Sequence, residues 1–375
     1  MRKNIYLDNA ATSPLKYEVK KHIISVLDVF GNPSSSHSKG EQALKIITNA
    51  RKSVAKFINS NTDDIIFTGG GCAGNTLAIK GYMDKHYCTL LYSPTAHKSI
   101  LKCAESCNQK YALEVDELGF IDLADLENWL KVLQDTAFVV IEYANSEIGT
   151  IQNVAEIVEL VHKYNGVIFV DCTGSVSTIP IDVKKSDIDI LSFSAHKIGG
   201  LKGCGVLYKK RNISLSPLIY GTQENGLFGG TENVIGIASL GKAVEKYDYS
   251  TVSSSAGDYV YNYIMNNIPE CYPVGAPVES GQRLPHNLYM CFKGVEGESL
   301  MLMLDMKGIQ VSTGSACRSG SLDASPTLTA IGMDEEDIHS CIRMSFGGNE
   351  TNEDLLYVCE TLKQCVKRLR NFAAS

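Results

Sequence analysis

Between about residues 60 and 210, the sequence alternates short apolar runs with segments of helical length. Such runs, rich in β-branched residues and apolar on both faces, are typical of strands buried between helices. In the segment 153–164, Val154, Ile157 and Val161 repeat at the spacing of a helix. This alternation predicts an α/β fold in which helices cover both faces of a mostly parallel sheet. The expected strands lie at 64–68, 89–92, 137–142, 166–171 and 189–194.

Ligands of such sheets bind at the carboxyl ends of the strands, and two polar residues stand there. Asp171 ends the fourth run, and Lys197 follows the fifth run by three residues. A buried carboxylate can bind a cationic ligand, a metal or a ribose hydroxyl, although Asp also caps helices. A desolvated lysine with a lowered pKa forms a Schiff base with an aldehyde, whereas a surface lysine only opens a loop.

The glycine-rich turn 68–74 follows the first strand and precedes a helical segment. Glycines allow a ligand to approach the backbone, and a helix start offers free N–H groups, so we expect a phosphate there. Gly69, Gly71 and Gly74 have the spacing of a dinucleotide-binding turn. The acidic residue expected some 20 positions later on a second strand is missing, which disfavours dinucleotide binding.

The cysteines are unevenly placed. Twelve in 375 residues are too few for a disulfide framework, and no pair has zinc-finger spacing, so we expect no metal site. Cys317 lies in the small, polar run 311–321, where no core is available to bury it and Arg318 favours the reactive thiolate. Arg343, inside the apolar run 341–347, needs a buried anion as partner, either a protein carboxylate or a substrate.

Charge and hydropathy exclude several classes of partner. The chain carries 35 Lys and Arg against 42 Asp and Glu and has no basic run, which disfavours nucleic acids and anionic membranes. No apolar run of 18 residues and no signal-peptide pattern occur, so we expect a cytoplasmic enzyme. The alternation of apolar runs and helical segments changes after the polar stretch 251–257. This change predicts a large α/β domain of 14–250 and a smaller α+β domain of 1–13 and 251–375.

In this order, the segments resemble the cysteine desulfurases, which belong to the class V aminotransferase group of the pyridoxal-phosphate (PLP) fold type I superfamily. The resemblance covers nearly the whole chain and starts with the motifs at 6–12 and 31–37. It continues through the glycine turn, the segment 145–149 and the two strand ends described above. The form of the thiol run 312–317 resembles the branch with a long mobile cysteine loop, which serves iron–sulfur assembly.

The resemblance implies a role for each matching residue. Lys197 would hold PLP covalently and move protons, Asp171 would pair with the ring nitrogen, and His97 would stack on the ring as an acid or base. Cys317 would attack the sulfur of L-cysteine, leaving a persulfide on the enzyme, alanine as product, and sulfur for an acceptor such as an iron–sulfur scaffold. Gly71, Cys72, Ser194 and His196 would bind the phosphate of the cofactor, and Thr231 would reach the phosphate of the partner subunit in a homodimer. Asn145 and Arg343 would bind the substrate carboxylate, and Asn145 would also lie beside the cofactor.

Several positions depart from the family pattern. The phosphate turn has Cys72 in place of Thr and Ala73 in place of an acidic residue, while Gly174 replaces a Gln at the cofactor's phenolic oxygen. The loop 225–231 has lost two arginines. Each lost contact to a charged phosphate costs roughly 1.5–3 kcal/mol, so PLP binding up to about a hundredfold weaker is expected. The alternatives are a related PLP enzyme, such as a selenocysteine lyase or a cystine lyase, and a sulfur-relay or scaffold protein of the same fold.

Overall fold

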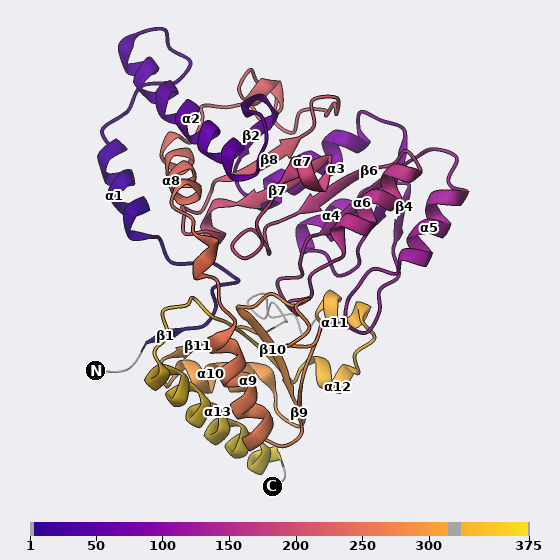
Figure 1. Ribbon diagram of the computed structural model, residues 1–375, viewed down its shortest axis with the longest axis vertical. Helices are drawn as coiled ribbons and strands as arrows, with labels where there is room; N and C mark the ends of the chain where they lie inside the picture. Colours follow the sequence, from indigo (N-terminus) through magenta and orange to yellow (C-terminus); the bar gives the residue numbers. More distant parts are fainter. Residues whose placement is uncertain (1–3, 314–323, 374–375) are drawn as a thin grey trace.

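The computed structural model describes residues 4–313 and 324–373, and a seven-stranded sheet forms its centre (Figure 1). The strand order is β2-β8-β7-β6-β5-β3-β4, with β8 antiparallel to both of its neighbours and every other pair parallel. The predicted α/β fold with a mostly parallel sheet is therefore confirmed. The strands are β2 (Ile65–Thr68), β3 (Cys88–Tyr92), β4 (Lys110–Ala112), β5 (Thr136–Glu142), β6 (Val167–Asp171), β7 (Ile190–Ser194) and β8 (Gly205–Lys209).

Helices cover both faces of this sheet because its strands are apolar on both sides. Phe138 and Val140 of β5 and Phe169 of β6 pack toward α3 (Gly71–Met83) and α4 (Lys98–Glu105). The intervening side chains of both strands pack toward the helices of the other face. Those helices are α2 (Ser38–Phe57), α5 (Leu123–Val132), α6 (Val154–Lys163) and α8 (Val234–Glu245), and α1 (Tyr17–Val26) and α7 (Val183–Ser186) each add a buried valine to the same core.

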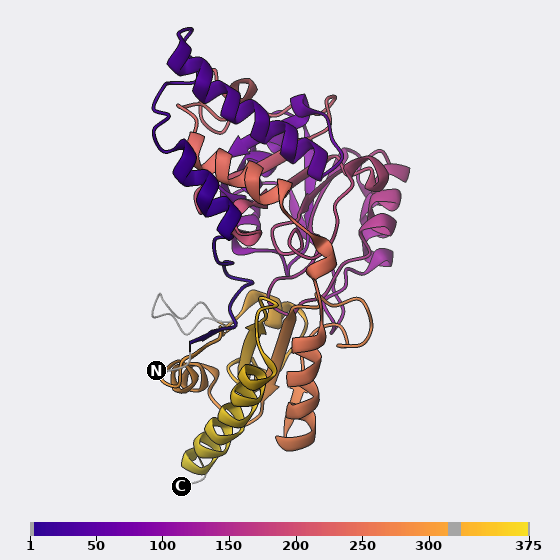
Figure 2. The same ribbon diagram turned by 60° about the vertical axis from the view of Figure 1, so that its left-hand side comes forward.

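A second group of elements lies below the large sheet in Figure 1 and has its own hydrophobic core. Its three strands are antiparallel in the order β12-β10-β9, and β1 (Ile5–Tyr6) pairs in parallel with β11 (Ile309–Gln310). Figure 2 shows α9 and α13 side by side against these strands. The exact domain boundaries remain a prediction. The other elements are α9 (Ser255–Asn267), β9 (Cys271–Pro273), β10 (Asn287–Phe292), α10 (Gly297–Asp305), α11 (Pro326–Ala330), α12 (Glu335–Ile338), β12 (Cys341–Ser345) and α13 (Asn352–Ala373).

Within the described residues, no helix combines the length and the apolar character needed to cross a lipid bilayer.

Candidate active site

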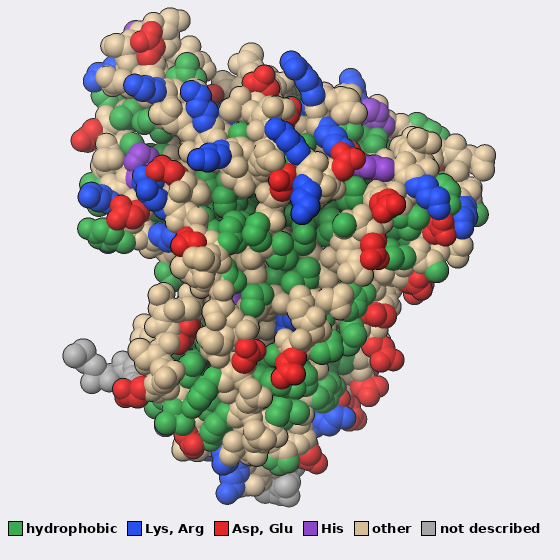
Figure 3. All heavy atoms as spheres, viewed as in Figure 1, with side chains coloured by type: hydrophobic (Ala, Val, Ile, Leu, Met, Phe, Trp, Pro, Cys, Tyr) green, Lys and Arg blue, Asp and Glu red, His purple; other side chains and the backbone are tan. Residues whose placement is uncertain are grey.

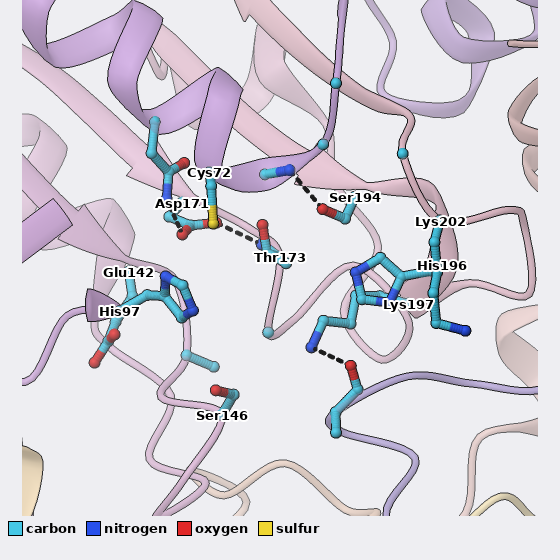
Figure 4. Close-up of a pocket in the computed structure, with 18 residues that line it drawn as sticks. Cys72, His97, Glu142, Ser146, Asp171, Thr173, Ser194, His196, Lys197 and Lys202 are labelled. Atoms are coloured by element: carbon cyan, nitrogen blue, oxygen red, sulfur yellow. Dashed lines mark hydrogen bonds between the residues drawn. The ribbon is translucent and has the colours of Figure 1, made fainter. Parts of the chain in front are cut away.

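A cavity of about 380 Å³ opens where β5, β6 and β7 end and α3 begins (Figure 4). Parallel strands bring their carboxyl ends to one edge, so residues far apart in sequence meet there. Of the predicted residues, seven line the cavity, and the structure brings them together: Gly71, Cys72, His97, Asp171, Ser194, His196 and Lys197.

Lys197 reaches the cavity from the short 3-10 turn Ala195–Lys197, which directly follows β7. Its ammonium donates hydrogen bonds to the carbonyl oxygens of Ala10 and, at 3.1 Å, Ala11. These neutral acceptors do not repay the cost of removing the charge from water, so burial, together with the nearby Arg343 charge, lowers the pKa of Lys197 to about 8. The amine is therefore partly neutral near physiological pH, as a lysine that attacks an aldehyde must be.

Asp171 is the last residue of β6 and is 4% exposed. Its carboxylate accepts hydrogen bonds from the side-chain amide of Asn75 at 2.7 Å and from the backbone N–H of Thr173 at 2.8 Å. Both donors stabilise the charged form, so Asp171 is positioned to pair with a cation in the cavity. Figure 4 shows Asp171 and His97 on one side of the cavity and Lys197 on the other.

Asn75 is a site residue that the sequence analysis missed. It lies in α3, is 1% exposed, and connects Asp171 to the hydroxyl of Ser99 through a second hydrogen bond of 3.0 Å. Its own carbonyl oxygen accepts from the hydroxyl of Ser192 at 2.5 Å. The only signal in the sequence was a polar residue directly after the glycine turn, in the first turns of the helix.

His97 precedes α4 and caps its N-terminus. Its Nδ1 accepts the backbone N–H of Ser99 at 3.1 Å and lies 2.8 Å from the Ser99 hydroxyl. Desolvation lowers the pKa of the ring, although the Asp171 charge acts in the opposite direction. A neutral ring whose Nδ1 accepts carries its proton on Nε2, which leaves that N–H to donate.

The part of the cavity at the start of α3 is suited to an anion. The backbone N–H of Gly71, at the start of α3, donates to Oγ of Ser194 at 2.6 Å. A Cβ at position 71 would lie 2.9 Å from both Ser194 Oγ and Thr173 Oγ1, so only glycine fits this turn. Thr173 Oγ1 is itself buried without a hydrogen-bond partner. Burial lowers the pKa of His196 to about 4, so this ring is neutral at pH 7.

Arg343 and Asn145 do not line this cavity. The guanidinium of Arg343 binds the carboxylate of Asp8 at 2.8 Å and the carbonyl oxygen of Ser146 at 2.9 Å, while its Nε is buried without a partner. The anion that Arg343 meets is thus Asp8, whose side chain is only partly buried. The amide nitrogen of Asn145 donates to Thr95 O and to Glu142, each at 2.8 Å. A substrate role for Arg343 and Asn145 stays a prediction.

Two further predicted residues lie elsewhere. Thr231 is exposed and borders a neighbouring cavity of about 120 Å³, not the cavity of its own chain's Lys197. This position leaves open its predicted contact with the phosphate of a partner subunit. Cys317 lies outside the described residues. Within the described ranges 4–313 and 324–373, no cluster of three His, Cys, Asp or Glu side chains suits a metal ion.

Comparisons with known proteins agree with this geometry. The family model of the class V aminotransferases matches residues 5–358. A cysteine desulfurase IscS of Dictyoglomus turgidum is 38% identical over 393 aligned positions, covering 100% of this chain and 97% of the relative. A second one, from Methanosarcina thermophila, is 37% identical over 99% of this chain and 94% of its own length.

Solved structures give the same result. The NifS-like protein of Rickettsia africae superposes with a TM-score of 0.89 at 29% identity, covering 97% of this chain and 99% of that protein. SspA, solved in complex with cysteine, superposes with a TM-score of 0.79 at 29% identity, covering 93% of this chain and 100% of that protein. The strand-end cavity and the similarity along the whole chain lead to one conclusion: this chain belongs to the cysteine desulfurase family of the class V aminotransferases.

Proposed function

We propose that this protein is a PLP-dependent cysteine desulfurase. It converts L-cysteine to L-alanine and passes the sulfur, first held as a persulfide on Cys317, to a protein acceptor such as an iron–sulfur scaffold. The observation that carries the proposal is the meeting of Asp171 and Lys197 in one cavity. Family membership and the cysteine complex of SspA support the choice of substrate.

The residues of the cavity fit PLP. Lys197 offers an amine of lowered pKa to the aldehyde, and Asp171 offers a fixed carboxylate to the ring nitrogen. Thr173 Oγ1, buried and without a partner, lies beside the N-terminus of α3, where a phosphate would satisfy it. Cys72 and Gly174 line this cavity without restoring the contacts expected of Thr and Gln at these positions. A Cβ at position 174 would lie 2.7 Å from the carbonyl oxygen of Ala144, so the backbone leaves no room for a side chain at this position.

When bound, PLP supplies an electron sink that weakens the bonds around the α-carbon of the amino acid. The chain's own residues prepare this chemistry. Asp171 would hold a proton on the ring nitrogen, and the network through Asn75 and Ser99 fixes the orientation of both Asp171 and His97. The amine of Lys197, with a pKa of about 8, can accept or release a proton near neutral pH.

Sulfur leaves the substrate by attack of a thiolate. The Cys317 thiolate bonds to the sulfur of cysteine, the sulfur–carbon bond breaks, and the released electron pair is protonated at carbon to give alanine. A thiol reductant or an acceptor thiol then removes the outer sulfur atom from the persulfide. No external oxidant is needed, because the electron pair of the broken carbon–sulfur bond stays on carbon: the β-carbon is reduced to the methyl group of alanine as the transferred sulfur is oxidised from the thiol to the persulfide level.

The assay that tests this function follows alanine and sulfide formation from L-cysteine in the presence of PLP and a thiol reductant. Equal amounts of the two products are expected, with sulfide release falling sharply when the reductant is omitted. Formation of pyruvate and ammonia in place of alanine would contradict the proposal and point to a lyase. L-selenocysteine and L-cystine in parallel reactions test the related PLP activities.

We also propose that the protein is a homodimer. Apolar side chains are exposed along α1 and the segment that follows it; this α1 patch comprises Tyr17, Ile24, Leu27 and Phe30. Figure 3, in the same view as Figure 1, shows hydrophobic side chains at the left edge of the molecule, where α1 lies. Phe30 is 79% exposed, and apolar surface gathered in this way marks a protein interface.

A charge inside the α1 patch should disrupt the dimer. We expect wild-type protein to elute with twice the chain mass of 40.9 kDa and Phe30→Asp to shift toward the monomer, since an unpaired carboxylate cannot be buried in an apolar interface. Light scattering after size-exclusion chromatography measures this. Tyr87, 78% exposed outside the patch, provides the control Tyr87→Asp. A wild-type monomer, or equal dissociation of both variants, would overturn the assignment.

A further inference from the structure

A second carboxyl group stands next to Asp171. Glu142 ends β5 as Asp171 ends β6, and the two residues are register partners in adjacent parallel strands. Both side chains lie on the α3–α4 face, because they continue the alternation of Val140 and Phe169, which pack there. Adjacent strands are about 4.8 Å apart, so the two side chains leave the sheet as neighbours. Both line the cavity.

Glu142 has no cation as a partner. It is 5% exposed and makes no ion pair with any residue that the structure describes. One carboxyl oxygen, Oε1, accepts both available hydrogen bonds, from the hydroxyl of Thr95 at 2.9 Å and from the amide of Asn145 at 2.8 Å. The other oxygen is left for a proton. In contrast, Asp171 receives one N–H donor on each oxygen, which suits a charged carboxylate.

The charges around Glu142 favour a protonated Glu142 beside a charged Asp171. Asp171 faces it from β6 and Glu147 from the loop after β5, while His97 and Lys197 face the same cavity from the loop before α4 and from the 3-10 turn. Burial raises the pKa of Glu142 to about 8; the two hydrogen bonds act in the opposite direction, and the negative charge of Asp171 adds to the rise. Two carboxyl groups that share one buried site do not both ionise readily.

We propose that Glu142 and Asp171 form a carboxyl pair that holds one proton on Glu142 and one negative charge on Asp171. Glu142 is thereby a positioning residue, because its protonation state sets the net charge of the pair in the cavity. In this state the pair carries one negative charge, which would balance the one positive charge of a protonated ring nitrogen. When Glu142 loses its proton at alkaline pH, the cavity gains a second negative charge. That charge stabilises every protonated group opposite the pair, including Lys197 and the cofactor ring.

Infrared spectroscopy of the full-length protein tests the proton directly. The carbonyl stretch of a protonated carboxylic acid is separate from the carboxylate bands, and at pH 7 exposed carboxylates do not contribute to it. We expect this band in the wild type at pH 6–7 and its decrease as the pH rises through about 8. Because the titration of the wild type needs no variant, the test does not depend on the folding of one.

Two variants assign the band. Glu142→Gln keeps the hydrogen-bonding shape and should lose the titrating signal, and any signal that remains belongs to Glu147, whose burial also raises its pKa. Asp64, 7% exposed just before β2, lies at the opposite edge of the sheet, so Asp64→Asn is the matched control and should keep the signal. Equal spectra of wild type and Glu142→Gln across pH 6–9 would overturn the proposal.

A second readout rests on the proposed function. With PLP bound, the pH midpoint of the cofactor's visible absorption should be lower in Glu142→Gln by about half a unit or more, a change of about threefold in proton affinity, because the variant never gains the second negative charge. An unchanged midpoint in a protein that binds PLP would contradict the positioning role. If the protein failed to bind PLP, the proposed function would fail while the infrared result on Glu142 still stood.

Discussion

Replacing Lys197 by alanine is expected to lower desulfurase activity by at least about 10³-fold, the range of a positioned acid–base group combined with the loss of covalent attachment. Lys197 is the lysine whose amine is desolvated inside the cavity, with a pKa lowered to about 8. Alanine removes both the group that binds the aldehyde and the group that moves protons at the α-carbon. Alanine formation from L-cysteine under saturating PLP measures the effect.

Lys202 provides the matched control for this experiment. It lines the same cavity but is exposed, so Lys202→Ala should change activity by less than about tenfold. A circular dichroism spectrum equal to that of the wild type confirms that each variant has folded. A Lys197→Ala protein that kept full activity would contradict the catalytic assignment.

Substitution of Cys317 by alanine should remove sulfide formation by at least about 10²-fold while leaving PLP binding intact, because a thiolate nucleophile has no substitute in the transfer step. The cofactor's absorption spectrum should therefore match that of the wild type even though turnover is lost. Mass spectrometry after a single addition of L-cysteine should find one extra sulfur atom on the peptide that contains Cys317.

Cys72, a thiol that does line the cavity, serves as the control. Cys72 is exposed at the start of α3 and lines the cavity, so Cys72→Ser tests whether any nearby thiol can accept sulfur. We expect this variant to keep the persulfide on Cys317. If Cys317→Ala retained full turnover, the reaction would run without a persulfide at this position, and a lyase would be the better description.

Much of the large sheet could be predicted from the sequence, because strands buried on both faces carry long apolar runs. The five expected strands are present as β2, β3, β5, β6 and β7. β8 was missed, since it begins at Gly205, directly after a glycine-rich stretch that has the composition of a loop. The small strand β4 was also missed, because two of its three residues are exposed.

Within the site, the strand-end rule identified Asp171 and the segment leading to Lys197. The same rule applies to Glu142, which ends an equally apolar run, but the sequence does not reveal its neighbours. Asn75 is 96 residues from Asp171, and Asp8 is 335 residues from Arg343. Such pairings depend on strand order and on the path of the N-terminal segment, which local patterns do not encode.

The central claim is that Lys197 captures an aldehyde cofactor opposite the carboxylate of Asp171. The most direct test adds PLP to the purified protein, treats the mixture with borohydride to make any carbon–nitrogen bond to a lysine permanent, and maps the label by peptide mass spectrometry. The account predicts one labelled residue, Lys197, with the label lost in Lys197→Ala. Labelling of another lysine, or none at saturating PLP, would contradict it.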